Sequence, residues 1–249
     1  MVNYCNQMVM IEYYNPIIYV YYKGFMMLPR YENKLNEIRT QLSRLVASIM
    51  SANEETLNAF ENNQSDLFES AKLHLKTIQT DANKIDNEVI KTLALYGPEA
   101  EELRLLVAFL KMTNELDRVG ENMKKYNNRI QELCRGECDL NIMVPSIIQL
   151  QKTTLNALRY IHEYLENMHT MDAEELYRKV SVEESKNDDL FSIIEKDLLN
   201  LIAESHELSA NYVKVLSTLR KLERTGDRTV NIAALLLYAQ QGGELNFHA

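Results

Sequence analysis

The chain has 249 residues, enough for one large domain or for two domains of about 100 to 125 residues. It contains only 7 Gly and 4 Pro and no Trp, which favours long helices over strands and hairpins. The formal net charge is −9, so we expect no basic face that would neutralise the phosphates of a nucleic acid. The three cysteines, Cys5, Cys134 and Cys138, are too few for a disulfide framework and indicate a reducing cytoplasm.

Residues 1–26 differ in composition from the rest of the chain. They hold six of the 14 tyrosines and only two charged side chains. Pro16 interrupts the apolar run, and Lys23 and Gly24 end it before it reaches the roughly 20 residues that a membrane span needs. We therefore predict no transmembrane segment and treat residues 1–26 as an extension outside the fold.

From Tyr31 to Gln241, apolar residues recur at steps of three and four, the spacing of amphipathic helices. Gly97 suits the left-handed position after a helix, and Pro98 suits the first turn of the next helix. Asp172 has capping-box spacing to Glu175. Six long helices are predicted, divided at residues 62–64, 97–98, 134–143, 170–172 and just before 205–207, and the last ends before Gly242–Gly243.

One six-residue motif occurs twice, as Leu-Asp-Arg-Val-Gly-Glu at 116–121 and as Leu-Glu-Arg-Thr-Gly-Asp at 222–227. Its two glycines are 106 residues apart, close to half the chain, which indicates a duplicated unit. Because short turns make neighbouring helices antiparallel, we predict an all-α fold of two pseudo-symmetric three-helix bundles. The predicted boundaries are 27–136 for repeat 1, 137–241 for repeat 2 and 242–249 for a C-terminal tail.

Each copy of the motif places two carboxylates four residues apart on one helix face: Asp117 with Glu121, and Glu223 with Asp227. Like charges at this spacing repel, so a bridging cation would remove a penalty as well as add an attraction. A glycine inside a helix costs about 0.5 to 1 kcal/mol relative to alanine. Its recurrence inside the motif predicts the close approach of a neighbouring helix or of a bulky ligand.

The helix before each motif supplies further acids. In repeat 2, Glu184 and Asp188 are four residues apart and are expected to converge with the acids of the motif into a four-carboxylate cluster, with Asn231 one turn beyond. Carboxylate sites of this kind suit magnesium, calcium, manganese or iron, and also accept zinc.

The counterpart in repeat 1 is weaker. Asp86 takes the place of Asp188, but Ala82 lies four residues before it and Asp81 is one step off that face. We therefore expect the first site to be short of a ligand.

The residues alone leave other interpretations open. The acidic pairs would be solvated faces, or Arg118 and Arg224 would form salt bridges that lock the helices of a metal-free adaptor. A carboxylate-bridged di-iron oxidase is the enzymatic alternative, but such bundles use Glu-x-x-His motifs and none lies near the acidic pairs. We find no Gly-rich phosphate loop or nucleophile elbow, and expect no enzymatic activity.

Residues 222–232, Leu-Glu-Arg-Thr-Gly-Asp-Arg-Thr-Val-Asn-Ile, resemble the signature of the PhoU family of phosphate transport system regulatory proteins. In that family an acid-Arg-Ile-Gly-Asp core is followed by Asn-Ile. The segment from Glu102 to Glu121 resembles the signature of the first repeat, and the resemblance spans about Met27 to Gln241.

The resemblance implies a cytoplasmic, non-enzymatic protein, peripheral at the inner face of the membrane and homodimeric. Such a protein would act with the phosphate ABC transporter and a phosphate-sensing histidine kinase as a negative regulator of phosphate uptake and of the starvation response.

The resemblance also implies metal ions, whether iron, zinc, manganese or magnesium. Lys125 replaces the Asn that the family places one turn after Glu121, which again weakens the first cluster. The implied ligands are Glu184, Asp188, Glu223 and Asp227 with Asn231 nearby in the second cluster, and Asp86, Asp117 and Glu121 in the first.

Overall fold

The computed structural model describes residues 16–135, 143–204 and 207–243, and side chains from Arg30 onward. These residues form seven α-helices and no strand, so the predicted all-α fold is confirmed. The helices are α2 (Pro16–Asn62), α3 (Ser65–Leu75), α4 (Ile78–Tyr96), α5 (Ala100–Cys134), α6 (Val144–Glu166), α7 (Ala173–Glu204) and α8 (Ser209–Gln241).

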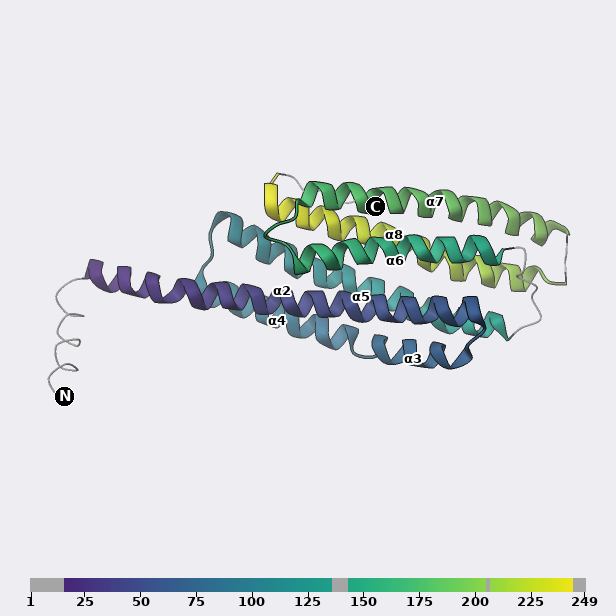
Figure 1. Cartoon of the computed structure of the whole chain (residues 1–249), viewed down its shortest axis with the longest axis horizontal. Helices are drawn as coiled ribbons and strands as arrows, with labels where there is room; N and C mark the ends of the chain where they lie inside the picture. The colour runs from purple at the N-terminus through teal and green to yellow at the C-terminus, as the bar shows by residue number, and fades with distance from the viewer. Residues whose placement is uncertain (1–15, 136–142, 205–206, 244–249) are drawn as a thin grey trace.

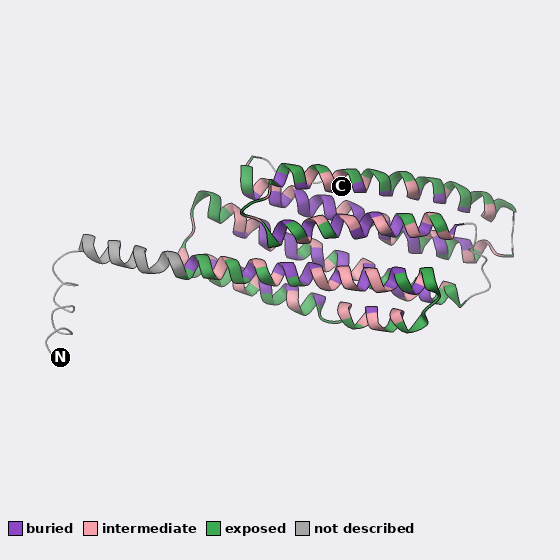
Figure 2. Cartoon of the chain, in the orientation of Figure 1, coloured by how far each residue is buried: buried purple, intermediate pink, exposed green. Residues whose placement is uncertain are grey.

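The helices run side by side along the long axis of the molecule in two bundles (Figure 1). The first bundle holds α2, α3, α4 and α5, and the second holds α6, α7 and α8. The bundles meet through matching elements, because α5 packs on α8 and α2 packs on α6. Buried residues face inward between the helices and form one continuous core (Figure 2). The two repeats are therefore packed as a pseudo-twofold pair.

Two helix boundaries differ from the sequence prediction. The second predicted helix is interrupted at Lys76 and Thr77, where the Lys76 N–H bonds to the Leu73 carbonyl and α4 restarts from Thr77. The first helix begins at Pro16 and not near Tyr31, so residues 16–26 continue the helical backbone of α2. The rest of the predicted N-terminal extension, and residues 244–249 of the predicted tail, lie outside the described residues.

Helix ends explain how the chain turns between elements. Gly97 adopts φ 56° and ψ 52°, and its N–H bonds to the Leu93 carbonyl, which is the left-handed cap that the sequence predicted. Pro98 was wrongly placed at the first helical position, because α5 starts at Ala100 with Glu99 as its N-cap residue. Asp172 accepts a bond from the Glu174 N–H at 3.1 Å, so it caps α7 as expected.

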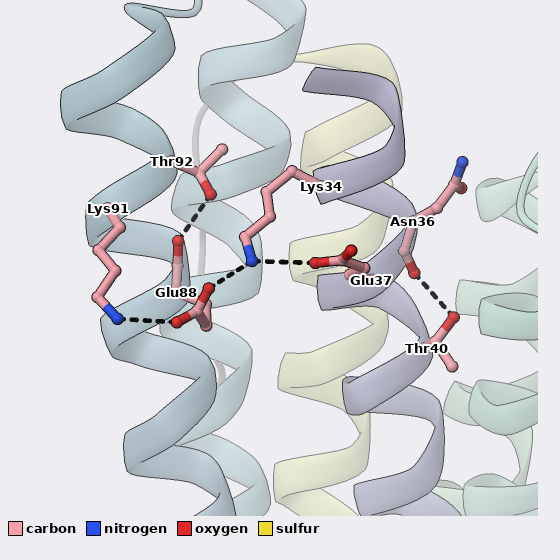
Figure 3. Close-up of polar contacts among 7 residues, drawn as sticks. All are labelled: Lys34, Asn36, Glu37, Thr40, Glu88, Lys91 and Thr92. Atoms are coloured by element: carbon pink, nitrogen blue, oxygen red, sulfur yellow. Dashed lines mark hydrogen bonds and ion pairs between the residues drawn. The ribbon is translucent and has the colours of Figure 1, made fainter. Parts of the chain in front are cut away.

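Ion pairs connect α2 with α4 at the surface. The Lys34 ammonium bridges Glu88 on α4 and Glu37 on its own helix, and Lys91 also pairs with Glu88 at 2.9 Å (Figure 3). The bond from Lys34 lowers the pKa of the Glu88 carboxyl, and Lys91 lowers it further. Exposed pairs of this kind contribute little stability.

A buried polar network joins the two bundles. The Gln151 amide on α6 donates to the carbonyl and side-chain oxygens of Asn53 on α2, at 3.0 and 2.8 Å. The Tyr126 hydroxyl on α5 donates to Gln151 Oε1 at 2.9 Å, and Asn53 donates to Thr154. All four side chains are buried. Because each buried group has its partner, the network fixes the register of α2, α5 and α6.

No helix in the described part of the chain combines the length and apolar character needed to cross a membrane.

Candidate metal centre

Three carboxylates gather between α7 and α8. Glu184 and Asp188 lie one turn apart on α7, Asp227 lies on α8, and one oxygen from each falls within 4.8 Å of the other two. Glu184 and Asp227 are half-buried and Asp188 is exposed. The antiparallel packing of the two helices therefore brings together three of the four acids predicted for the second cluster.

Glu223, the fourth predicted acid, lies one turn before Asp227. Burial raises the pKa of its carboxyl, and the charges of Asp227 and Asp188 raise it further. Burial and then Asp188 likewise raise the pKa of Asp227. Removing the carboxylates from water and placing them together disfavours their ionised forms, and a cation would relieve that repulsion.

Two buried oxygen atoms on α8 lack a hydrogen-bond partner within the described residues. They are Oε2 of Glu223, one turn before Asp227, and Oδ1 of Asn231, one turn after it. A buried oxygen without a partner is costly, and carbonyl and carboxylate oxygens are the ligands that hard cations prefer. The donor set therefore fits a metal ion such as magnesium, manganese or iron.

Asn187 is a residue that sequence reasoning missed. It is buried, and its amide donates to Thr153 Oγ1 at 2.7 Å and to the Leu150 carbonyl on α6. A Cβ added at Gly226 would lie 3.4 Å from Asn187 Cγ, so this glycine lets α7 approach α8. The sequence offered one signal: Asn187 comes directly before Asp188, on the helix that was expected to pack against the motif at 222–227.

The first cluster is not assembled in this way. Asp86 accepts a hydrogen bond from the Thr113 hydroxyl, and Asp81 pairs with Lys84 at 2.8 Å. Glu121 lies 3.7 Å from both Lys124 and Lys125. Asp117 keeps one buried oxygen without a partner among the described residues. Within those residues, only Glu184, Asp188 and Asp227 form a group of three or more possible metal-binding side chains.

Helix register explains the difference between the repeats. Ile78 faces Gly120 as Asn187 faces Gly226, with Ile78 Cγ2 only 2.7 Å from a Cβ added at Gly120. Asp86 lies instead beside Thr113, seven residues before Gly120 and about 10 Å away along α5. When the repeats are aligned on these contacts, the positions of repeat 1 that match Glu184 and Asp188 are Leu75 and Gln79, and not Ala82 and Asp86. Metal binding by repeat 1 stays a prediction.

The arginines of the motif do not lock the helices together. In the described part of the chain, neither Arg118 nor Arg224 forms an ion pair. Arg228 does, because its Nη1 donates to both carboxylate oxygens of Glu115 on α5, at 3.3 and 3.1 Å. The ion pair between α5 and α8 therefore lies just outside the repeated motif.

Comparison with known proteins agrees with this architecture. The PhoU domain matches the chain twice, over residues 40–130 and 147–236. The chain belongs to the PhoU family. Each match falls inside one of the predicted repeats.

Relatives in this family carry a shared name. The Phosphate-specific transport system accessory protein PhoU of Escherichia coli K12 is 24% identical over 215 residues, which cover 86% of each chain. The Phosphate-specific transport system accessory protein PhoU homolog of Pseudomonas aeruginosa is 23% identical over 217 residues, or 87% of each chain.

Solved PhoU structures share the fold. The crystal structure of PhoU from Pseudomonas aeruginosa has a TM-score of 0.73 at 24% identity, and the match covers 86% of this chain and 100% of that one. The phosphate transport system regulatory protein PhoU from Streptococcus pneumoniae also has a TM-score of 0.73, at 19% identity, over 87% of this chain and 99% of that one.

Proposed function

We propose that this PhoU-family protein is a negative regulator of phosphate uptake and of the phosphate-starvation response. It acts with the phosphate ABC transporter and its sensor histidine kinase, by binding them and not by catalysis. The observation that carries this proposal is the pair of PhoU domain matches, together with relatives named as phosphate-specific transport system accessory proteins. We propose in addition that the protein acts in the cytoplasm, at the inner face of the membrane, and as a homodimer.

The second acidic cluster is the proposed metal site. Glu184, Asp188, Glu223 and Asp227 would hold iron, zinc, manganese or magnesium, with Asn231 as an accessory ligand. The grouped carboxylates and the buried oxygens without partners support this assignment. A bound metal would neutralise the repulsion between the acids and tie α7 to α8. In repeat 1, Asp117 and Glu121 remain the candidate ligands, whereas Asp86 and Asp81 are bonded to Thr113 and Lys84 and are the less favourable candidates.

The regulatory proposal is tested in cells. Deleting the gene should release phosphate uptake and the starvation response from repression at high phosphate, and the intact gene should restore repression. Unchanged repression in the deletion strain would refute the regulatory role.

The metal is tested separately, with Glu223→Ala and Asp227→Ala combined. We expect elemental analysis of the purified variant to show loss of metal, and repression and recovery of the transporter in membrane pull-downs to weaken. If metal is lost but both other readouts stay intact, the metal is not regulatory.

A further inference from the structure

Four cations come together where α5 packs against α8. Lys125 and Arg129 lie on α5, and Lys221 and Arg224 lie on α8. Arg129 reaches across to α8, where it donates to the carbonyl and hydroxyl oxygens of Ser217 at 3.4 and 3.3 Å. Arg228 makes a second contact across the same two helices, with Glu115 on α5. Lys125 and Lys221 lie on the turns between these two contacts, and Arg224 lies one turn before Arg228.

The positive surface continues along both helices. Arg118 lies seven residues before Lys125 on α5, and Arg228 lies seven residues after Lys221 on α8, so each shares a helix face with its neighbour. Acids also lie at this surface: Arg228 engages Glu115, Glu121 lies 3.7 Å from Lys125, and the exposed Glu132 lies seven residues after Lys125. We call the six cations the basic surface; they are Arg118, Lys125, Arg129, Lys221, Arg224 and Arg228.

The basic surface corrects one expectation drawn from the sequence. A formal charge of −9 predicted that the chain has no basic face. The net charge does not reveal the basic surface, because its cations come from two segments about 100 residues apart in the chain that only the fold brings side by side. Net charge describes the whole molecule and not each of its faces.

The basic surface has the chemistry to bind carboxylates. Arg118 and Arg224 are exposed and form no ion pair within the described residues, and Lys125 and Arg129 are also exposed. Guanidinium groups bind carboxylates through paired hydrogen bonds. By contrast, Lys84 and Lys91 of the groove between α2 and α4 are already paired with Asp81 and Glu88.

The size of the basic surface limits what can bind to it. The cations from Arg118 to Arg129 span about 16 Å along α5. Outside this surface the chain is acidic, and charges act over a screening length of about 8 Å in physiological salt. A membrane surface or a nucleic-acid duplex is an extended polyanion, so it would meet the acidic remainder of the molecule. A short acidic segment would contact the cations alone.

We propose that the basic surface is a docking surface for a short acidic segment of a partner protein. It lies between α5 and α8, whereas the acidic cluster lies between α7 and α8. The charge of Arg224 still acts on Glu223 and Asp227, so the two surfaces are electrostatically coupled.

Fluorescence anisotropy of the full chain tests this inference. The probe is a labelled ten-residue peptide of alternating Glu and Ser, with a Gln and Ser peptide as the neutral control. We expect the acidic peptide alone to bind, and its affinity to fall as salt is raised. Lys221→Gln combined with Arg224→Gln should weaken binding by about tenfold, since two exposed charge pairs are lost.

The matched control is Lys84→Gln combined with Lys91→Gln, which removes the same charge from α4 and should leave the affinity unchanged. Circular dichroism would verify that both variants are folded. Equal weakening by the two variants would show a non-specific charge effect, and no binding of the acidic peptide would also overturn the inference. Vesicles containing phosphatidylserine are added as a third probe. If the protein binds these vesicles and not the peptide, and the Lys221→Gln and Arg224→Gln variant loses that binding, the surface is assigned to membranes instead.

Discussion

Gly120 and Gly226 hold the same place in the repeated motif but meet different neighbours. Gly226 faces the amide of Asn187 at an ordinary contact distance, whereas Gly120 faces the β-branched side chain of Ile78. Ile78 is buried and stiff, and its Cγ2 cannot swing aside as the end of a long side chain would.

We predict that Gly120→Ala destabilises the protein and Gly226→Ala does not. The new methyl at 120 would overlap Ile78, at a cost of about 1 to 3 kcal/mol. At 226 the contact with Asn187 is tolerable, and alanine favours the helix by about 0.5 to 1 kcal/mol. Urea unfolding of both variants measures the difference. Equal effects would show that the Ile78 contact relaxes freely.

The acidic cluster should make the stability of the metal-free protein depend on pH. The pKa values of Glu223 and Asp227 are raised from their ordinary values of 4.5 and 3.8, so the folded state binds protons more tightly than the unfolded state. The stabilisation from these two carboxyls is fully present at pH values below their ordinary pKa values. It is lost as the pH rises through their raised pKa values.

Glu223→Gln should remove the contribution of Glu223 to this loss. In chelator, the free energy of unfolding of the wild type should fall relative to that of Glu223→Gln as pH rises from about 4 to 7. Denaturant titrations across this range measure the effect. A difference between the two proteins that stays constant with pH would contradict the raised pKa of Glu223.

At the scale of elements, sequence periodicity predicted the helices well because each carries a clear apolar face. The break between α3 and α4 was not predicted, since neither Lys76 nor Thr77 is a strong helix breaker. The pairing of Glu184 and Asp188 with the second motif could be predicted, because spacing within a helix fixes which residues share a face. The register between two helices is set by tertiary packing, so Asp86 was matched to Asp188 by residue type alone.

The difference in helix register between the two repeats leads to a prediction about which acids bind metal. Asp188→Ala should lower the metal content of the purified protein, because it removes a carboxylate from the group between α7 and α8. Asp86→Ala should leave the metal content unchanged and cost about 1 kcal/mol of stability, through loss of the bond from Thr113. Elemental analysis and urea unfolding give the two readouts. A fall in metal for Asp86→Ala would restore Asp86 as a ligand.

At the scale of the whole molecule, the duplication gives one cooperative body because the repeats share a core and a buried polar network. Gln151→Leu would leave the Tyr126 hydroxyl without its acceptor and the side-chain oxygen of Asn53 without its donor. We expect a loss of about 2 to 4 kcal/mol, since each buried polar group left unpaired costs about 1 to 3 kcal/mol.

The matched control is Gln149→Leu, the same change at an exposed position of α6. It should alter stability by less than about 0.5 kcal/mol. Chemical denaturation followed by two probes measures both variants and reports whether the repeats unfold together. A small effect of Gln151→Leu would mean that water replaces the lost bonds.

Because helix register differs between the repeats, only one of the two bundles carries the acidic cluster within the described residues. Two equivalent acidic clusters related by a pseudo-twofold would let a partner that recognises them bind in either of two orientations. In the described residues, only the α7 and α8 pair gathers three carboxylates, while Leu75 and Gln79 take the positions of Glu184 and Asp188 in the first bundle. A partner that recognised the cluster would therefore bind in one orientation, with one copy for each chain.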